Sequence, residues 1–361
     1  MLAQTSSNSP ERLSSVQALR GLAACLVMVS HLWVIEQKYS PDQILGAWAD
    51  FGQLGVDLFF SISGFIMVYV TWSVTRNPIQ ARRFLLARIF RIYPIYWLIS
   101  SVLLGLWIIR PDIVFSTTST DPNILKSFLL LPDKQAPLLA VGWTLIHEMF
   151  FYIVFAFSLL FPRKALLPIL AVWSLITWLG YTLINHNASA EFALIFSPLN
   201  FEFILGACAA WVFKSAKHPN AKLQWAKVSL WLACVLWIGL ALLALLNNGT
   251  MPLSHASRAL VFSVPAALTL YAFASANSAG YSAPRWAVSI GDYSYGLYLT
   301  HVLTLSLLGR IWQMFAVDGP LDNIAALIIM SLASIAVSAV LWTFIEAPLM
   351  TVFKVKLRSK S

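Results

Sequence analysis

The chain has 361 residues, of which 59% are hydrophobic and only 11% charged, and its formal net charge is +9. A soluble domain carries about a quarter charged residues, so this composition excludes a soluble globular protein and predicts an all-α bundle of membrane helices. A transmembrane barrel is excluded as well, because its strands would give short alternating segments rather than long apolar runs.

Ten apolar runs have the length of about 20 residues that a helix needs to cross a bilayer. No linker or change in composition divides them into separate domains. The three cysteines all lie in apolar runs, and they predict neither a disulfide framework nor a metal site. We therefore predict one bundle of about ten transmembrane helices, at residues 16–35, 54–73, 89–109, 140–161, 165–184, 199–213, 227–246, 256–276, 289–309 and 324–346.

The loops between these spans alternate in charge. Loops on one side carry Lys and Arg with almost no acidic residue, whereas loops on the other side carry most of the Asp and Glu. Because excess Lys and Arg stays in the cytoplasm, both termini are predicted to be cytoplasmic. The predicted organisation is a flexible tail at 1–14, a transmembrane domain at 15–350 and a basic tail at 351–361. This charge distribution favours contact with anionic membrane lipid over contact with nucleic acid.

The first span contains an arginine and a histidine, Arg20 and His31. Ionisable side chains are costly in hydrocarbon and usually mark function. Eleven residues are close to three helical turns, so both side chains lie within roughly 20° on one face and roughly 16 Å apart. A neutral imidazole can take a proton from a hydroxyl, which makes His31 a candidate general base. The alternative is a structural histidine bonded to a carbonyl oxygen.

The second span begins with the phrase GVDLFFSISGF, in which Asp57 lies near the outer surface. A carboxylate at this depth is a functional candidate because its charge is costly there. Small residues on a membrane helix commonly mark close packing against another helix. We therefore assign Ser61, Ser63 and Gly64 to packing.

The third span carries Arg88 and Arg91, which are three residues apart and share one face at the cytoplasmic end of the helix. Arginine at this depth can simply extend to lipid phosphates. The functional alternative is a docking site for a phosphate-bearing cytoplasmic donor, because guanidinium binds phosphate bidentately.

The fourth span contains Glu148, which lies below the outer surface. His31 lies in the outer half of the first span, so the two depths are compatible with contact. A carboxylate in contact with the imidazole would orient it and raise its basicity. The neighbouring His147 points about 100° away on the helix. The alternative is a structural ion pair of Glu148 with Arg20 or His301.

The ninth span carries Ser294, Tyr298 and His301 at the spacing i, i+4, i+7, which predicts one polar stripe along the helix. The stripe either lines an interior passage or belongs to a packed aromatic face. At the inner end of the tenth span, Glu346 is predicted to pair with an arginine of the third span as a structural salt bridge.

Six phrases, in order along the chain, together resemble the membrane-bound acyltransferase-3 family. They are the Arg20 and His31 pair, GVDLFFSISGF, RxxRIxPxYW at residues 88–97, WTLxxExFFY at 143–152, SYxxYLxH at 294–301 and FIExP at 344–348. The resemblance covers residues 14–350. The phrase VGWTLIHEMFFY is most similar to the exopolysaccharide O-acetyltransferase subgroup.

The resemblance implies a multi-pass protein of the bacterial inner membrane that moves an acyl group, usually acetyl, from cytoplasmic acyl-coenzyme A to a hydroxyl of a glycan or lipid-linked sugar. It makes His31 the essential histidine, with Arg20 as its partner, and it makes Arg88 and Arg91 the residues that hold the donor. No metal is expected. We also expect Glu148 and Asp57 to act in catalysis, and Trp143, Tyr298 and His301 to contact the substrate.

Two chemical roles are open for His31: a base that deprotonates the acceptor hydroxyl, and a nucleophile that forms an acyl-imidazole. Two other functions are open as well. A proton-coupled transporter or flippase for a lipid-linked sugar or small metabolite would also use intramembrane His, Glu and Arg, although an internal repeat typical of many transporters is missing. A non-catalytic scaffold in a polysaccharide-assembly complex would leave the buried ionisable groups unexplained.

Overall fold

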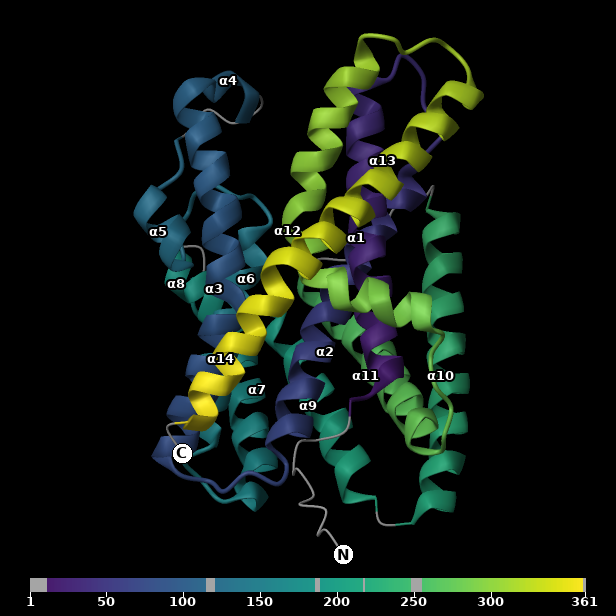
Figure 1. The fold of residues 1–361 in the computed structure, drawn as a ribbon. Helices are drawn as coiled ribbons and strands as arrows, with labels where there is room; N and C mark the ends of the chain where they lie inside the picture. Colours follow the sequence, from purple (N-terminus) through teal and green to yellow (C-terminus); the bar gives the residue numbers. More distant parts are fainter. Residues whose placement is uncertain (1–11, 115–120, 186–188, 217, 248–254, 360–361) are drawn as a thin grey trace, which may run out of the picture.

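The computed structural model describes residues 12–114, 121–185, 189–216, 218–247 and 255–359, and within these ranges every regular element is a helix. Most of the long helices run up and down beside one another, and the rod formed by α13 and α14 crosses them obliquely (Figure 1). Their bounds are α1 (Ser14–Tyr39), η1 (Ala47–Gln53), α2 (Leu54–Thr71), α3 (Pro78–Ile109), α4 (Pro111–Val114), α5 (Ile124–Leu129), α6 (Gly142–Ser158), η2 (Arg163–Ala165), α7 (Leu166–Leu183), α8 (Ala190–Ile195), α9 (Asn200–Ser215), α10 (Pro219–Leu246), α11 (His255–Ser278), α12 (Arg285–Gln313), α13 (Pro320–Leu341), η3 (Trp342–Glu346) and α14 (Ala347–Ser359).

Each of the ten predicted spans coincides with a helix, which confirms the prediction of a polytopic helical membrane protein. Eight stretches of the described residues are long and apolar enough to cross a membrane. The two remaining predicted spans are α6, which is apolar but has only 17 residues, and α12, which has 29 residues but does not reach the same apolarity. These two helices carry Glu148 and the predicted polar stripe.

Several helices extend beyond the apolar runs that predicted them. Helix α3 begins at Pro78 rather than near residue 89, because the side chain of Asn77 accepts a hydrogen bond from the backbone N–H of Gln80 at 2.8 Å and caps the helix. At the other end of the chain, α13, the π-helical turn η3 and α14 follow without interruption to Ser359, past the boundary predicted at residue 350. Most of the predicted tail at 1–14 lies outside the described residues.

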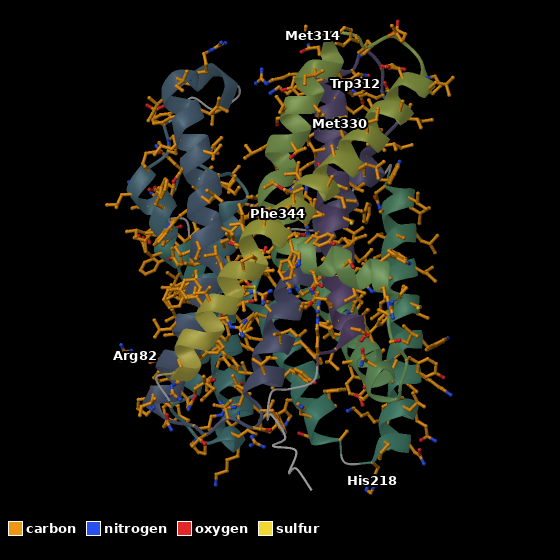
Figure 2. The ribbon with its side chains drawn as sticks, in the orientation of Figure 1. Arg82, His218, Trp312, Met314, Met330 and Phe344 are labelled. Carbon is orange, nitrogen blue, oxygen red and sulfur yellow. The ribbon has the colours of Figure 1, made fainter. Side chains whose placement is uncertain are left out.

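The chain alternates in direction as the loop charges predict. In Figure 1 the beginning of α1 and the end of α14 both lie in the lower half of the bundle. In Figure 2, Arg82 in the first turns of α3 and His218 just before α10 lie towards that same lower end, and Met314 lies at the opposite end. Arg82 and His218 belong to the basic segments that the loop charges assign to the cytoplasmic side.

Several helix contacts are close enough that only glycine fits, and two of them bear on the site. A Cβ atom on Gly206 of α9 would lie 1.9 Å from the carbonyl oxygen of Ser61 in α2, and one on Gly291 of α12 would lie 2.0 Å from the carbonyl oxygen of Gln17 in α1. Small residues let membrane helices approach closely, because packing rather than a hydrophobic driving force holds them together. The first contact agrees with the packing role predicted for Ser61. The second sets α1 against α12, which carry His31 and His301.

Three aromatic side chains of α3 hold the end of α5. The last carbonyl groups of a helix have no partner within it and need donors from elsewhere. Here the donors come from the RxxRIxPxYW phrase, at distances of 2.7–2.8 Å: Tyr96 to the carbonyl of Ser127, Trp97 to that of Phe128 and Tyr93 to that of Leu129. This anchor fixes the start of the segment at 130–138, which leads from α5 towards α6.

Candidate functional site

Two neighbouring cavities hold most of the residues that the sequence analysis singled out. One has a volume of about 180 Å³ and is lined by Arg20 of α1 and by Arg88 and Arg91 of α3, and we call it the basic cavity. The other has a volume of about 890 Å³ and contains His31 and His147, and we call it the histidine cavity. Val56 of α2 and Tyr298 of α12 line both, so the two cavities meet at these side chains.

The basic cavity brings together Arg20 of α1, Arg88 and Arg91 of α3 and Glu148 of α6. The guanidinium group of Arg88 lies over the ring of Tyr152, 5.8 Å from its centroid. Its Nε atom is buried and has no hydrogen-bond partner among the described residues. Three guanidinium groups facing one carboxylate leave an excess of positive charge, which suits an anionic ligand such as a phosphate.

Glu148 is held by two hydroxyl groups. Ser63 Oγ donates to Glu148 Oε1 at 2.9 Å, and the hydroxyl of Tyr152 donates to the same oxygen. The predicted contact of Glu148 with His31 is wrong, because no hydrogen bond among the described residues joins them. Helix α6 instead turns Glu148 into the basic cavity. Ser63, which the sequence analysis assigned to packing, is a hydrogen-bond donor to this carboxylate.

A second carboxylate approaches the arginines from η3. Glu346 is buried, with 2% of its surface exposed, and it interacts electrostatically with Arg91 and Arg20. The predicted salt bridge between Glu346 and an arginine of the third span is not formed among the described residues, and the Oε2 atom of Glu346 has no hydrogen-bond partner there. Glu346 thus supplies part of the negative charge that allows several guanidinium groups to lie inside the bundle.

In the histidine cavity, His31 contacts His301. The Nδ1 atom of His31 lies 2.9 Å from the carbonyl oxygen of Val27 and 3.4 Å from Nε2 of His301. The two rings are almost perpendicular, with centroids 4.8 Å apart. His301 is buried at 1% exposure, so the two imidazoles form a pair in which only His31 reaches the cavity wall.

The predicted polar stripe of α12 is confirmed. Ser294, Tyr298 and His301 are all buried and face the site. Ser294 lines the basic cavity, Tyr298 lines both cavities, and His301 lies behind His31. The hydroxyl of Tyr298 is 2.7 Å from the hydroxyl of Thr144 in α6, which fixes the ring at the junction.

Asp57 belongs to a buried charge cluster at the wall of the histidine cavity. Its carboxylate is 3.0 Å from the guanidinium of Arg258 in α11, and Arg258 also donates to Gln53 at 3.0 Å. Glu202 of α9 is fully buried beside this pair and interacts electrostatically with both charges. The sequence analysis did not single out Arg258, although a cation inside the eighth predicted span was a usable signal.

The rim of the histidine cavity is formed partly by Trp143 and by the segment at 132–137. Trp143 is 41% exposed and packs edge-on against His147, with ring centroids 5.6 Å apart. It is therefore the most accessible of the aromatic residues predicted to contact substrate.

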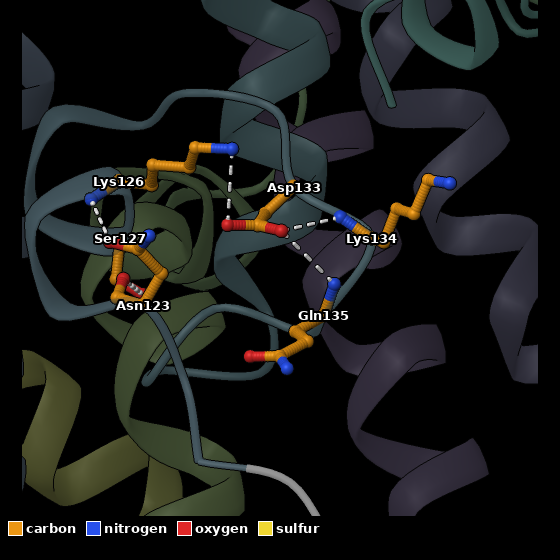
Figure 3. A network of polar contacts seen from close by, with 6 residues as sticks. All are labelled: Asn123, Lys126, Ser127, Asp133, Lys134 and Gln135. Carbon is orange, nitrogen blue, oxygen red and sulfur yellow. Dashed lines mark hydrogen bonds and ion pairs between the residues drawn. The ribbon is translucent and has the colours of Figure 1, made fainter. Parts of the chain in front are cut away.

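A local polar network holds the shape of this segment (Figure 3). The ammonium group of Lys126 lies 3.3 Å from the Asp133 carboxylate, which also accepts hydrogen bonds from the backbone N–H groups of Lys134 and Gln135. Burial alone would raise the pKa of Asp133, but Lys126 and these two N–H groups hold that pKa below its usual value. The rim is thus an ordered structure rather than a loose loop.

Comparison with known proteins identifies related chains. The acyltransferase-3 family, described as an acyltransferase domain, matches residues 13–343. The exopolysaccharide production protein ExoZ of Rhizobium meliloti (strain 1021) is 28% identical over 310 residues, which is 83% of this chain and 90% of that protein. Nodulation protein 10 of Rhizobium leguminosarum bv. viciae is 26% identical over 373 residues, covering 92% of both chains. No solved structure matches at a significant level.

Proposed function

The chain belongs to the acyltransferase-3 family, and from this premise we propose that it O-acylates an exopolysaccharide or its lipid-linked precursor in the bacterial inner membrane. It is a multi-pass membrane acyltransferase by family and by its apolar helices. The proposal adds a donor, acyl-coenzyme A, with acetyl as the acyl group. It also adds the acceptor, which the similarity to an exopolysaccharide production protein supports. The observation that carries the proposal is that a basic cavity and a histidine cavity meet at Tyr298 and Val56.

The donor is proposed to bind at the basic cavity. Coenzyme A carries several phosphate charges, and guanidinium groups bind phosphate through parallel hydrogen bonds. Arg88 and Arg91 would hold these phosphates, while the pantetheine arm extends between the helices towards Tyr298. Arg20 and Glu148 line the same cavity and would position the arm and the thioester.

His31 is proposed to act as the general base. Its imidazole takes the proton of the acceptor hydroxyl as the hydroxyl oxygen attacks the thioester carbonyl carbon. The carbon–sulfur bond breaks, and the coenzyme A thiolate leaves with the proton that the imidazolium returns. The products are the O-acyl sugar and free coenzyme A, so no proton is left on the enzyme. Direct attack by His31, with an acyl-imidazole intermediate, is the alternative sequence of the same bond changes.

The acceptor is proposed to enter from the histidine cavity. Its larger volume, about 890 Å³, is in the range of pockets that hold drug-sized ligands, and a sugar residue falls in this range. The half-exposed ring of Trp143 offers a flat apolar surface for a sugar ring, beside the polar rim at 132–137.

The test uses the purified full chain in lipid nanodiscs with labelled acetyl-coenzyme A and a lipid-linked glycan extract. We expect wild type to release coenzyme A thiol and to label the glycan, and His31→Ala to do neither. The matched control is His218→Ala, which removes an exposed histidine immediately before α10, at the lower end of the bundle, and should transfer label normally (Figure 2). Full transfer by His31→Ala would refute the role of His31. Movement of a lipid-linked sugar without thiol release would instead support a flippase.

The donor site has its own pair of variants. Arg88→Ala removes a buried guanidinium from the basic cavity, whereas Arg82→Ala removes an exposed one from the same helix (Figure 2). We expect Arg88→Ala to raise the KM for acetyl-coenzyme A by about tenfold or more, because a charge-assisted hydrogen bond contributes about 1.5–3 kcal/mol. An equal change in both variants would remove Arg88 from the donor site.

A further inference from the structure

The contacts of His31 and His301 indicate which nitrogen of each imidazole ring carries the proton. Each imidazole has its Nδ1 atom next to a backbone carbonyl oxygen of its own helix: 2.9 Å from Val27 for His31 and 3.0 Å from Leu297 for His301. Nδ1 of His31 also lies 3.4 Å from Nε2 of His301 and 3.4 Å from Oγ of Ser30, a hydroxyl that can donate or accept. The two carbonyl contacts determine where the ring protons are.

A carbonyl oxygen only accepts hydrogen bonds, so each Nδ1 atom must carry a hydrogen. A neutral imidazole has one N–H, and therefore Nε2 of His301 is an unprotonated acceptor. It faces Nδ1–H of His31, whose single hydrogen is shared between the Val27 carbonyl oxygen at 2.9 Å and Nε2 of His301 at 3.4 Å. The same count leaves Nε2 of His31 unprotonated. That nitrogen is the basic atom of a residue that lines the histidine cavity.

We propose that His301 is a positioning residue: its unprotonated Nε2 shares the Nδ1–H of His31 with the Val27 carbonyl oxygen, and the two acceptors together hold His31 in the tautomer that leaves Nε2 as the base. This proposal rests on the proposed function, because it assigns the reacting nitrogen of the same histidine. It replaces the substrate-binding role predicted for His301. The buried position of His301 supports this, because with 1% of its surface exposed it has little access to a substrate.

The pair also accounts for the charge that forms during the reaction. When Nε2 of His31 takes the proton of the acceptor hydroxyl, the ring becomes a cation and its Nδ1–H becomes a stronger donor. The lone pair of His301 then accepts a charge-assisted hydrogen bond, which is shorter and about twice as strong as a neutral one. The separation of 3.4 Å is long for such a bond, and catalytic hydrogen bonds often tighten only when substrate binds. His301 stays neutral throughout, and the proton leaves through Nε2 of His31.

The first experiment compares two substitutions of His301 in the acyl-transfer assay. Gln at this position offers an amide oxygen as an acceptor for Nδ1–H of His31, whereas Leu offers none. We expect His301→Leu to lower kcat by about 10- to 100-fold, which is part of the rate enhancement that a general base supplies. We expect His301→Gln to lower log kcat by at most two thirds as much as His301→Leu does. His218→Leu serves as the control for removal of a histidine. Equal activity of the Gln and Leu variants would overturn the proposal.

The second experiment reads the tautomer directly and does not depend on acyl transfer. Nitrogen NMR of the full chain with labelled histidine distinguishes a protonated from an unprotonated ring nitrogen, and His31→Ala identifies the His31 signals. We expect Nδ1–H and a bare Nε2 for His31 in wild type, and a mixture of tautomers in His301→Leu. A wild-type His31 with its proton on Nε2 would refute the proposal even if the enzyme is active. Absence of acyl transfer with the expected tautomer would refute the proposed function alone.

Discussion

Replacement of Gly206 by alanine should separate two helices that position the site. Gly206 of α9 faces the backbone of Ser61 in α2, and the new Cβ atom would lie 1.9 Å from the Ser61 carbonyl oxygen. An ordinary contact between carbon and oxygen is about 3.3 Å, so the helices must separate by about 1.4 Å, the difference between these distances. The atom in the way belongs to the backbone, so no change of side-chain rotamer relieves the clash.

The expected loss of stability is about 3 kcal/mol or more. Added methyl groups in a packed interior typically cost about 1–3 kcal/mol, and the upper end applies where nothing flexible can move aside. The change also reaches the site, because Ser63 and Asp57 lie on α2 whereas Glu202 lies on α9. Separation of the two helices would disturb the charge cluster around Asp57.

The measurement is the unfolding temperature of the purified variants in one detergent. Gly239→Ala in α10 is the matched control, since a Cβ atom there meets nothing within 4 Å. Alanine is the better helix former by about 0.8–1.0 kcal/mol, so this variant should be as stable as wild type or more so. We expect a clearly lower unfolding temperature for Gly206→Ala only. If both variants have the unfolding temperature of wild type, the close contact between α2 and α9 is not present in the folded protein.

Three further predictions concern charges and caps. Arg258→Leu leaves Asp57 buried without its counter-charge and should lower the free energy of unfolding by about 3 kcal/mol. This is the lower end for a broken buried pair, because 26% of the Arg258 side chain is exposed. The double variant with Asp57→Leu should recover stability, and an Arg258→Leu variant as stable as wild type would refute the pairing. Asn77→Ala removes the cap of α3 and should lower stability by about 1 kcal/mol, seen as a lower unfolding temperature. The lowered pKa of Asp133 means that its contact with Lys126 stabilises the rim above the unfolded-state pKa, about 4, and is lost as the pH falls through the folded-state value. The protection of backbone amides at 130–138, which is the exchange rate corrected for its intrinsic dependence on pH, should therefore decrease as the pH falls from 6 to 3 in wild type and change less in Asp133→Asn.

The sequence alone determined the class of the protein and the depth of its functional groups. Helix length and loop charge are local properties, so the ten spans and their alternating direction follow from apolar runs and from the positions of Lys and Arg. The cost of an ionisable group in hydrocarbon is local as well, and it singled out Arg20, His31, Asp57 and Glu148 without any structure. The stripe of α12 followed from helical periodicity.

The tertiary structure decided which of these groups meet. Glu148 contacts Ser63 and Tyr152 rather than His31, and His31 contacts His301. In a soluble protein the apolar face of a helix would have predicted its rotation towards the core. Lipid is as apolar as a leucine side chain, so the lipid-facing and core-facing sides of a membrane helix carry little difference in hydrophobicity. The depth of each group in the membrane can therefore be predicted from this sequence. The rotation and neighbours of each helix depend on the packing of the whole bundle, and so do the partners of every buried charge.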